Sequence, residues 1–235
     1  MRITALPFAT TTAVATAVAV VLLTGGCGGD GGSAPDEGEG EGRRLPTRAE
    51  VSAALLREDD LTGYDTVLPD DEAVPPDRSD RPRCLRALND LDYGTPASGT
   101  AVQARIQFGH SRLGPWIRQT LRVYRDDSTA EKAYERTLAD LVDCEEFTIT
   151  WSDLARTGTE RLRQTSNPRL GDRSWAAGIE VELGGFPSGE TKTLVRQGRL
   201  LVVISHAAAP DAPPREETED IARRATERAA RALDV

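Results

Sequence analysis

The stretch that decides the fold is WIRQTLRVYRDDSTAEKAYERTLADLVDCEEFTITW, residues 116–151. Its beginning alternates between apolar and polar side chains, with Ile117, Leu121 and Val123 on one face. Alternation with a period of two is typical of a β-strand that is buried on one side. The end of the stretch, Phe147–Trp151, alternates in the same way and predicts a second strand.

Between these strands the sequence predicts a helix that begins at Ser128. Ser128 and Glu131 have the spacing of a capping box, in which two side chains satisfy backbone N–H groups of the first turn. Apolar residues then recur at helical spacing almost to Cys144 and form a stripe that needs a sheet to pack against. The stripe consists of Ala130, Ala133, Tyr134, Leu138, Leu141 and Val142. We expect the remaining elements to be arranged around this strand–helix–strand unit.

Alternating stretches on both sides of the unit predict a mostly antiparallel sheet. Upstream, residues 102–108 alternate, and a loop at 109–115 joins them to the opening strand as in a hairpin. Downstream, strands are predicted over 159–164, 175–183, 191–196 and 200–205, with turns at 167–172, 184–189 and 197–199. Gly198 supplies a positive φ in the last of these turns. The final strand is apolar on both faces, which indicates a central strand that is covered on both sides.

Helices are predicted at both ends of the domain. Thr47 and Glu50 form a second capping box, and this helix ends near Glu58 with Val51, Ala54 and Leu55 facing inward. A short helix opens at Pro82 and turns Cys84, Leu88 and Leu91 to one side. The last helix follows Pro214 and buries Ile221, Ala225, Ala229, Ala232 and Leu233. The prediction is an α+β fold, a mostly antiparallel β-sheet packed by a central helix and by N- and C-terminal helices.

Residues 1–26 read as a lipoprotein signal peptide. The apolar core from Ala13 to Leu23 is shorter than the about 20 strongly apolar residues of a membrane span. The end, Leu22–Cys27, resembles a bacterial lipobox, although Thr24 stands where that motif usually has an aliphatic residue. The resemblance implies that Cys27 receives a lipid and becomes the mature N-terminus. A plain secreted protein and an uncleaved membrane anchor are the alternatives.

Residues 27–44 are predicted to be a flexible tether. The segment is rich in Gly and Glu and has no apolar residue larger than Ala after Cys27, so it cannot build a core. We expect the single α+β domain to cover residues 45–235. The lipid would hold this domain at the outer face of the cytoplasmic membrane.

The two remaining cysteines, Cys84 and Cys144, lie inside the predicted domain. Export would place them in an oxidising compartment, where they can pair. A loop of this length would gain roughly 4 kcal/mol of stability from the cross-link in the chain-entropy model. Two buried free thiols are the alternative.

The composition and motifs exclude several functional classes. The formal net charge of −9 is unsuited to nucleic acid, which needs a basic face. The chain has no nucleophile elbow, P-loop or dinucleotide fingerprint. His110 and His206 have no partners at metal-ligand spacing, and the acidic run Asp70–Glu72 lacks a calcium-loop frame, so we assign no metal and no cofactor.

Two sets of residues are candidates for a site. Glu180 and Glu182 share one face of a strand and could perform acid–base chemistry, although a solvent-exposed face explains them as well. Trp116, Trp151 and Trp175 fall at strand ends and could line a ligand cleft; the alternative is a place at the rim of the core.

The order of the features resembles a known family. These features are the turn Asp60–Tyr64 after a helix, Cys84 on a short helix, the run Val123–Ser128 into a helix that ends at Leu141–Cys144, Leu170–Asp172, and the Val195–Gly198 hairpin. They are similar to the PknH-type sensor-domain family of actinobacterial envelope lipoproteins and receptor-kinase ectodomains. The resemblance implies a sheet with a cleft and a binding role, and it transfers no catalytic residue. Kinase-linked members have more cysteines, and the pair that remains here is Cys84 and Cys144.

We therefore expect a membrane-anchored, extracytoplasmic lipoprotein with a non-catalytic ligand-binding or sensor-like domain. Its partners would be the membrane, through the N-terminal lipid, and an envelope ligand or protein. The alternatives are an envelope hydrolase that uses a carboxylate pair and an accessory lipoprotein that binds a protein partner.

Overall fold

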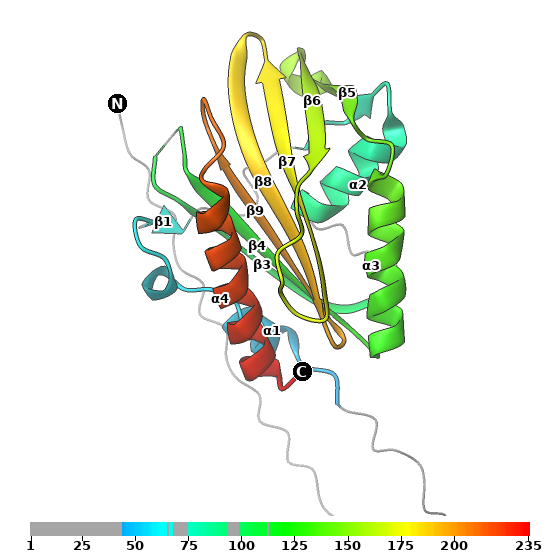
Figure 1. The fold of residues 1–235 in the computed structure, drawn as a ribbon, viewed down its shortest axis with the longest axis vertical. Coiled ribbons are helices and arrows are strands. Elements are labelled where there is room, and N and C mark those ends of the chain that lie inside the picture. The colour runs from blue at the N-terminus through cyan, green and yellow to red at the C-terminus, as the bar shows by residue number, and fades with distance from the viewer. Residues whose placement is uncertain (1–43, 65, 68–74, 94–98, 112) are drawn as a thin grey trace, which may run out of the picture. The chain divides into compact units, whose positions relative to one another are not determined.

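An antiparallel sheet of nine strands is the central layer of the residues that this computed structural model describes, which are 44–64, 66–67, 75–93, 99–111 and 113–235. The strand order is β1–β3–β4–β9–β8–β7–β6–β5–β2 (Figure 1). The signal segment, Cys27, most of the tether and the run Asp70–Glu72 lie outside the described residues.

The strands are β1 (Thr66–Val67), β2 (Arg78–Ser79), β3 (Thr100–Gly109), β4 (Trp116–Tyr124), β5 (Glu146–Trp151), β6 (Arg156–Gln164), β7 (Arg173–Leu183), β8 (Phe186–Gln197) and β9 (Leu200–Ala208). The helices are α1 (Arg48–Ala53), α2 (Pro82–Tyr93), α3 (Asp127–Leu141) and α4 (Arg215–Leu233), with 3₁₀ turns η1 (Glu58–Asp60) and η2 (Ser152–Leu154). The predicted α+β class is confirmed.

The opening stretch spans the sheet from one side to the other. Four strands, β9, β8, β7 and β6, lie between β4 and β5 in the sheet. Helix α3 makes the crossing, and it contacts β4, β8 and β9. The chain then returns through successive antiparallel hairpins until β9 pairs with β4. The strand–helix–strand unit thus places β4 and β5 on either side of the four strands that follow it in the sequence.

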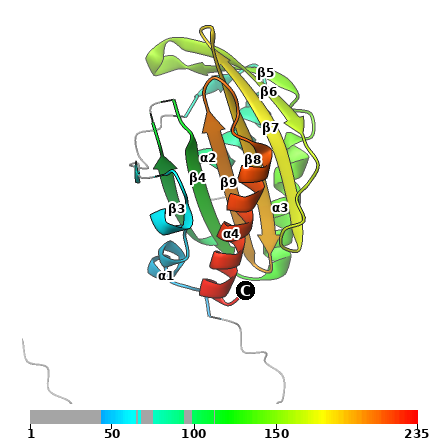
Figure 2. The ribbon, with the colours of Figure 1, turned by 60° about the vertical axis from the view of Figure 1, so that its left-hand side comes forward.

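Helices cover both faces of the sheet and create two apolar cores. Figure 2 shows α4 across β8 and β9, with α3 on the far side. One core joins α1 and α4 to the inward residues of β3, β4 and β9, and the other joins α2 and α3 to residues of β5, β7 and β9. Strand β9 contributes Val202 to the first core and Val203 to the second. The prediction of a central strand covered on both sides is confirmed.

The start of α3 differs from the prediction. Asp126 is the N-cap, and its carboxylate accepts a hydrogen bond from the backbone N–H of Thr129 at 2.7 Å. Ser128 lies inside the first turn. Extended backbone at Asp126 places the carboxylate over the third free N–H, so the helix begins before the predicted cap. By contrast, the capping box of Thr47 and Glu50 at α1 is confirmed.

The turn predicted at 184–189 is much shorter. Gly184 and Gly185, with φ of 59° and 83°, make the whole connection, and β8 begins at Phe186. Two positive φ values match the right-handed twist of a hairpin, and glycine adopts them without a steric penalty. Pro187 is tolerated in β8 because at this point the strand pairs only with β7.

Three smaller predictions are also wrong. Helix α1 ends at Ala53, and the chain reaches Glu58 through a bend before η1. Val142 and Ala232, predicted to be buried, are exposed. Val142 lies beyond the last helical residue of α3, where the helical spacing no longer applies.

Candidate ligand-binding site

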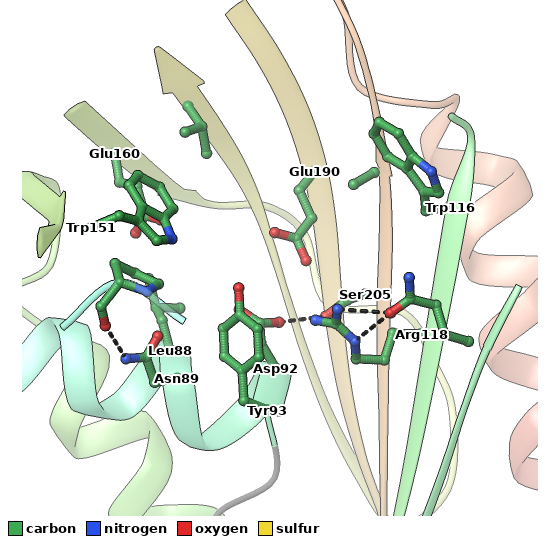
Figure 3. Close-up of a pocket in the computed structure, with 14 residues that line it drawn as sticks. Leu88, Asn89, Asp92, Tyr93, Trp116, Arg118, Trp151, Glu160, Glu190 and Ser205 are labelled. Carbon is green, nitrogen blue, oxygen red and sulfur yellow. Dashed lines mark hydrogen bonds between the residues drawn. The ribbon is translucent and has the colours of Figure 1, made fainter. Parts of the chain in front are cut away.

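A cavity of about 260 Å³ lies on the face of the sheet that α2 and α3 cover. The C-terminal half of α2 forms one wall, and strands from β3 across to β5 form the other (Figure 3). The lining residues are Pro76, Leu88, Asn89, Asp92, Tyr93, Gln107, Trp116, Arg118, Trp151, Glu160, Val181, Glu190, Ser205 and Ala207. Tryptophan, carboxylate and guanidinium side chains therefore share one concave surface.

The alternation of each strand explains why these residues meet. Along β9, Leu201 and Val203 belong to the core under the helices, and Ser205 and Ala207 continue the same face into the cavity. Along β6, Leu162 is in the core and Glu160 is in the cavity. Residues two apart point to the same face of a sheet. On β6 and β9 the site lies where this face changes from apolar to polar side chains.

Lys192 is the buried centre of the polar network beneath the cavity. Its side chain is 1% exposed, and its ammonium group forms ion pairs with Asp92 and Glu190. The ammonium group also donates to the hydroxyl of Ser205 at 3.1 Å, and that hydroxyl donates to Asp92 at 2.8 Å. Burial alone would lower the pKa of Lys192, but the two carboxylates outweigh it and raise the pKa to about 12. The ammonium group is therefore charged, and it holds α2 against β8 and β9.

Glu160 is a carboxyl group in an unusual state. Burial, and then the negative charge of Asp92, raise its pKa to about 8; Glu190 adds to this shift and Lys192 opposes it. The buried Oε2 atom of Glu160 has no hydrogen-bond partner among the described residues. At neutral pH this side chain is mostly a neutral acid.

Arg118 occupies the opposite end of the cavity from Glu160 (Figure 3). Its Nε and Nη2 atoms donate to Oε1 of Gln107 at 3.1 and 2.8 Å, and its guanidinium lies 5.0 Å from the centre of the Tyr93 ring. Such stacking holds a cation without neutralising it. Burial raises the pKa of Tyr93 to about 12, so its hydroxyl is a neutral donor or acceptor.

The three tryptophans separate into two groups. Trp116 and Trp151 are half-buried and both line the cavity (Figure 3). Trp175 is 4% exposed and belongs to the core under α3. It borders a different cavity of about 610 Å³ beside Cys144 and Leu162. A ligand role for Trp116 and Trp151 stays a prediction with a defined place, whereas Trp175 lies away from them.

The other candidate residues do not reach the cavity. Glu180 and Glu182 are exposed on the opposite side of β7 from Val181, which does line it. This position agrees with the solvent-face interpretation. His110 is exposed in the loop after β3. Among the described residues, no group of three or more His, Cys, Asp and Glu side chains is arranged to hold a metal ion.

His206 is fully buried on the other face of the sheet. Its Nε2 lies 2.5 Å from the hydroxyl of Tyr64, and its Nδ1 lies 2.9 Å from the hydroxyl of Thr218. The Tyr64 hydroxyl also donates to Glu217 at 3.0 Å. Burial lowers the pKa of His206 to about 4. The neutral imidazole joins Tyr64, β9 and α4, and it does not line the cavity between α2 and the sheet.

Asp92, Glu160, Glu190 and Lys192 were not singled out from the sequence. One signal for them was available, because Glu160 and Lys192 occupy inward positions of alternating strands where apolar residues are the rule.

A disulfide joins Cys84 of α2 to Cys144, with the Cα atoms 5.6 Å apart. It fixes α2 beside the end of α3 and so positions Asp92 and Tyr93. No helix among the described residues is long and apolar enough to span a membrane.

Comparison with known proteins reveals a likeness of fold. No protein-family model matches the chain, and no curated protein matches it. The fold is similar to the crystal structure of the extracellular domain of PknH from Mycobacterium tuberculosis, with a TM-score of 0.61 and 12% sequence identity. The match covers 81% of this chain and 100% of that chain. The resemblance drawn from the sequence is confirmed as a likeness of fold: the chain folds like the extracellular domain of PknH.

Proposed function

We propose that this protein is an extracytoplasmic lipoprotein whose domain binds a small ligand without transforming it. The observation that carries the proposal is the cavity between α2 and the sheet, which Trp116 and Trp151 line and which has a fixed ionic network at its base. A concave site with aromatic walls and a few placed polar groups is the usual form of a small-molecule site.

Two observations support the extracytoplasmic location. The Cys84–Cys144 disulfide is typical of oxidising compartments, and the fold is like that of an extracellular domain. The lipobox-like Leu22–Cys27 segment supports a lipid anchor at Cys27. The predicted tether would let the domain sample its ligand near the membrane surface.

Native mass spectrometry of the purified 45–235 domain, after incubation with a small-molecule extract of bacterial envelopes, tests ligand binding. We expect a retained low-mass adduct and a change in tryptophan fluorescence. Trp116→Ala and Trp151→Ala should each weaken retention at least tenfold, since each removes a wall of the cavity. Trp116 and Trp151 variants that retain the adduct as well as the wild type would place the ligand elsewhere.

A hydrolase is the second candidate function. A specific observation favours Glu160 and Glu190 as its carboxyl pair in place of Glu180 and Glu182. Burial keeps Glu160 protonated near neutral pH, whereas Glu190 forms an ion pair with Lys192. A protonated carboxyl group and a carboxylate in one cavity match the division of roles that glycoside hydrolysis uses. Turnover of an envelope polysaccharide that is lost in both Glu160→Gln and Glu190→Gln would establish this candidate and overturn the non-catalytic proposal.

A further inference from the structure

The charges around the inner end of the cavity do not balance. Three carboxyl groups gather there, Asp92 from α2, Glu160 from β6 and Glu190 from β8. Among the described residues, Lys192 is the cation that forms ion pairs in this group, and its two partners are Asp92 and Glu190. The third carboxyl group, on Glu160, feels the charge of Lys192 but forms no ion pair within the described part of the chain.

Glu160 faces the cavity with a carboxyl oxygen that forms no hydrogen bond to a described residue. This oxygen, Oε2, is buried. A buried polar atom without a partner is costly, so such atoms are rare unless something else satisfies them. Arg118 is held away at the other end by Gln107 and Tyr93.

The walls of the cavity suit an organic cation. Trp116, Trp151 and Tyr93 present aromatic surface to it, and aromatic faces attract ammonium groups as well as apolar carbon. A carboxylate accepts a charge-assisted hydrogen bond from an ammonium group. We propose that the cavity binds a ligand with a protonated amine. The ammonium group donates a hydrogen bond to the Glu160 carboxylate, and the tryptophan-lined walls enclose the ligand. This inference rests on the proposed function and names the chemical class of its ligand.

Binding of a protonated amine should release a proton. The neutral Glu160 acid loses its proton to solvent as the ammonium group arrives, and the product is an ammonium–carboxylate pair. Charged groups around Glu160 are Asp92 from α2 and Glu190 and Lys192 from β8. These three already form a salt-bridged set, so the released proton comes from Glu160. The affinity should increase with pH up to the region where Glu160 is ionised without a ligand.

Three probes of one shape test the proposal: cyclohexylamine, cyclohexanol and cyclohexanecarboxylate. At pH 7 we expect cyclohexylamine to shift the indole N–H resonances of Trp116 and Trp151, with an affinity at least tenfold above that of the other two. Calorimetry in buffers of different ionisation enthalpy should show release of up to one proton per amine bound. Glu160→Gln should remove the preference for the amine and the proton release. Glu180→Gln, an exposed carboxylate on the neighbouring strand, should change neither.

The outcomes separate this inference from the proposed function. Equal or tighter binding of cyclohexanol or cyclohexanecarboxylate would overturn the amine inference and leave a ligand site in place. Absence of amine binding, together with a retained envelope molecule that depends on Trp151, would do the same. Amine binding that persists unchanged in Glu160→Gln would overturn the role of this carboxyl group. Failure of both the probes and the envelope extract would remove the site itself.

Discussion

His206 and Glu160 are buried titratable residues, and their contributions to stability change with pH in opposite directions. The pKa of His206 falls from 6.5 to about 4 on folding, so the unfolded chain binds the extra proton between these values. The stability from His206 is therefore complete above pH 6.5 and is lost as the pH falls toward 4. The pKa of Glu160 rises from 4.5 to about 8, so the folded protein holds the extra proton. Its contribution is complete below pH 4.5 and is lost as the pH rises toward 8.

Between pH 4.5 and 6.5 the two contributions should nearly cancel, which gives a first prediction. Each has a slope of at most about 1.4 kcal/mol per pH unit, and the slopes are opposite. In Glu160→Gln the free energy of unfolding should rise with pH across this window, and in His206→Gln it should fall. Urea denaturation at half-unit pH steps measures both. Carboxyl groups with a lowered pKa, such as Glu50 with a pKa of about 2, change the stability mainly below this pH window. Parallel curves for the two variants would contradict the assignment.

Lys192 supports a second prediction at the residue scale. Lys192→Met should lower the free energy of unfolding by about 3 kcal/mol, because it leaves the carboxylates of Asp92 and Glu190 close together and without their cation. The chain offers a matched control in its other lysine, Lys132, which is exposed on α3. Lys132→Met should change the stability by about 0.5 kcal/mol or less. Similar denaturation midpoints for the two variants would show that the buried network is not stabilising.

At the scale of elements, the Cys84–Cys144 disulfide joins α2 to the end of α3, and its removal is the third prediction. The bridge closes a loop with a sequence separation of 60 residues. The double variant Cys84→Ala/Cys144→Ala should lose about 4 kcal/mol of stability through greater entropy of the unfolded chain. Cys27→Ala, outside the described domain, is the control and should melt like the wild type. Because α2 carries Asp92 and Tyr93, the double variant should also bind cyclohexylamine more weakly than the wild type does at a temperature where both are folded.

Elements with strong periodicity were predictable from the sequence, and short or competing signals were not. Strands β3, β4, β5 and β7 follow from the alternation of apolar and polar residues in their sequences, although β4 is buried on both faces. Strands β1 and β2 have two residues each, which is too short for any period to be visible. The N-cap of α3 was misplaced because Asp126, Asp127 and Ser128 are all good caps, and only the backbone conformation selects the first.

At the scale of the whole molecule, the strand order decides what could be predicted of the site. Trp116 and Trp151 are singled out by their positions at strand ends, and both reach the cavity. Asp92, Glu160 and Glu190 are far apart in the sequence, and they meet only because β6, β7 and β8 are neighbours under the end of α2. The alternation within a strand fixes a side chain's face, but it carries no information about which strand lies beside it.

The last prediction concerns where the molecule is held in the cell. If Cys27 is lipidated, a metabolically incorporated fatty acid analogue should label the full chain expressed in a lipoprotein-processing bacterium, and the protein should sediment with membranes. Cys27→Ala should abolish the label, because the thioether forms only at that sulfur, whereas Cys84 and Cys144 are consumed by their disulfide. The tryptophan fluorescence spectrum of the domain should be the same in both forms, since the cavity lies within the described residues. Label that persists in Cys27→Ala would exclude the lipoprotein interpretation, and loss of the label with continued membrane sedimentation would favour an uncleaved anchor.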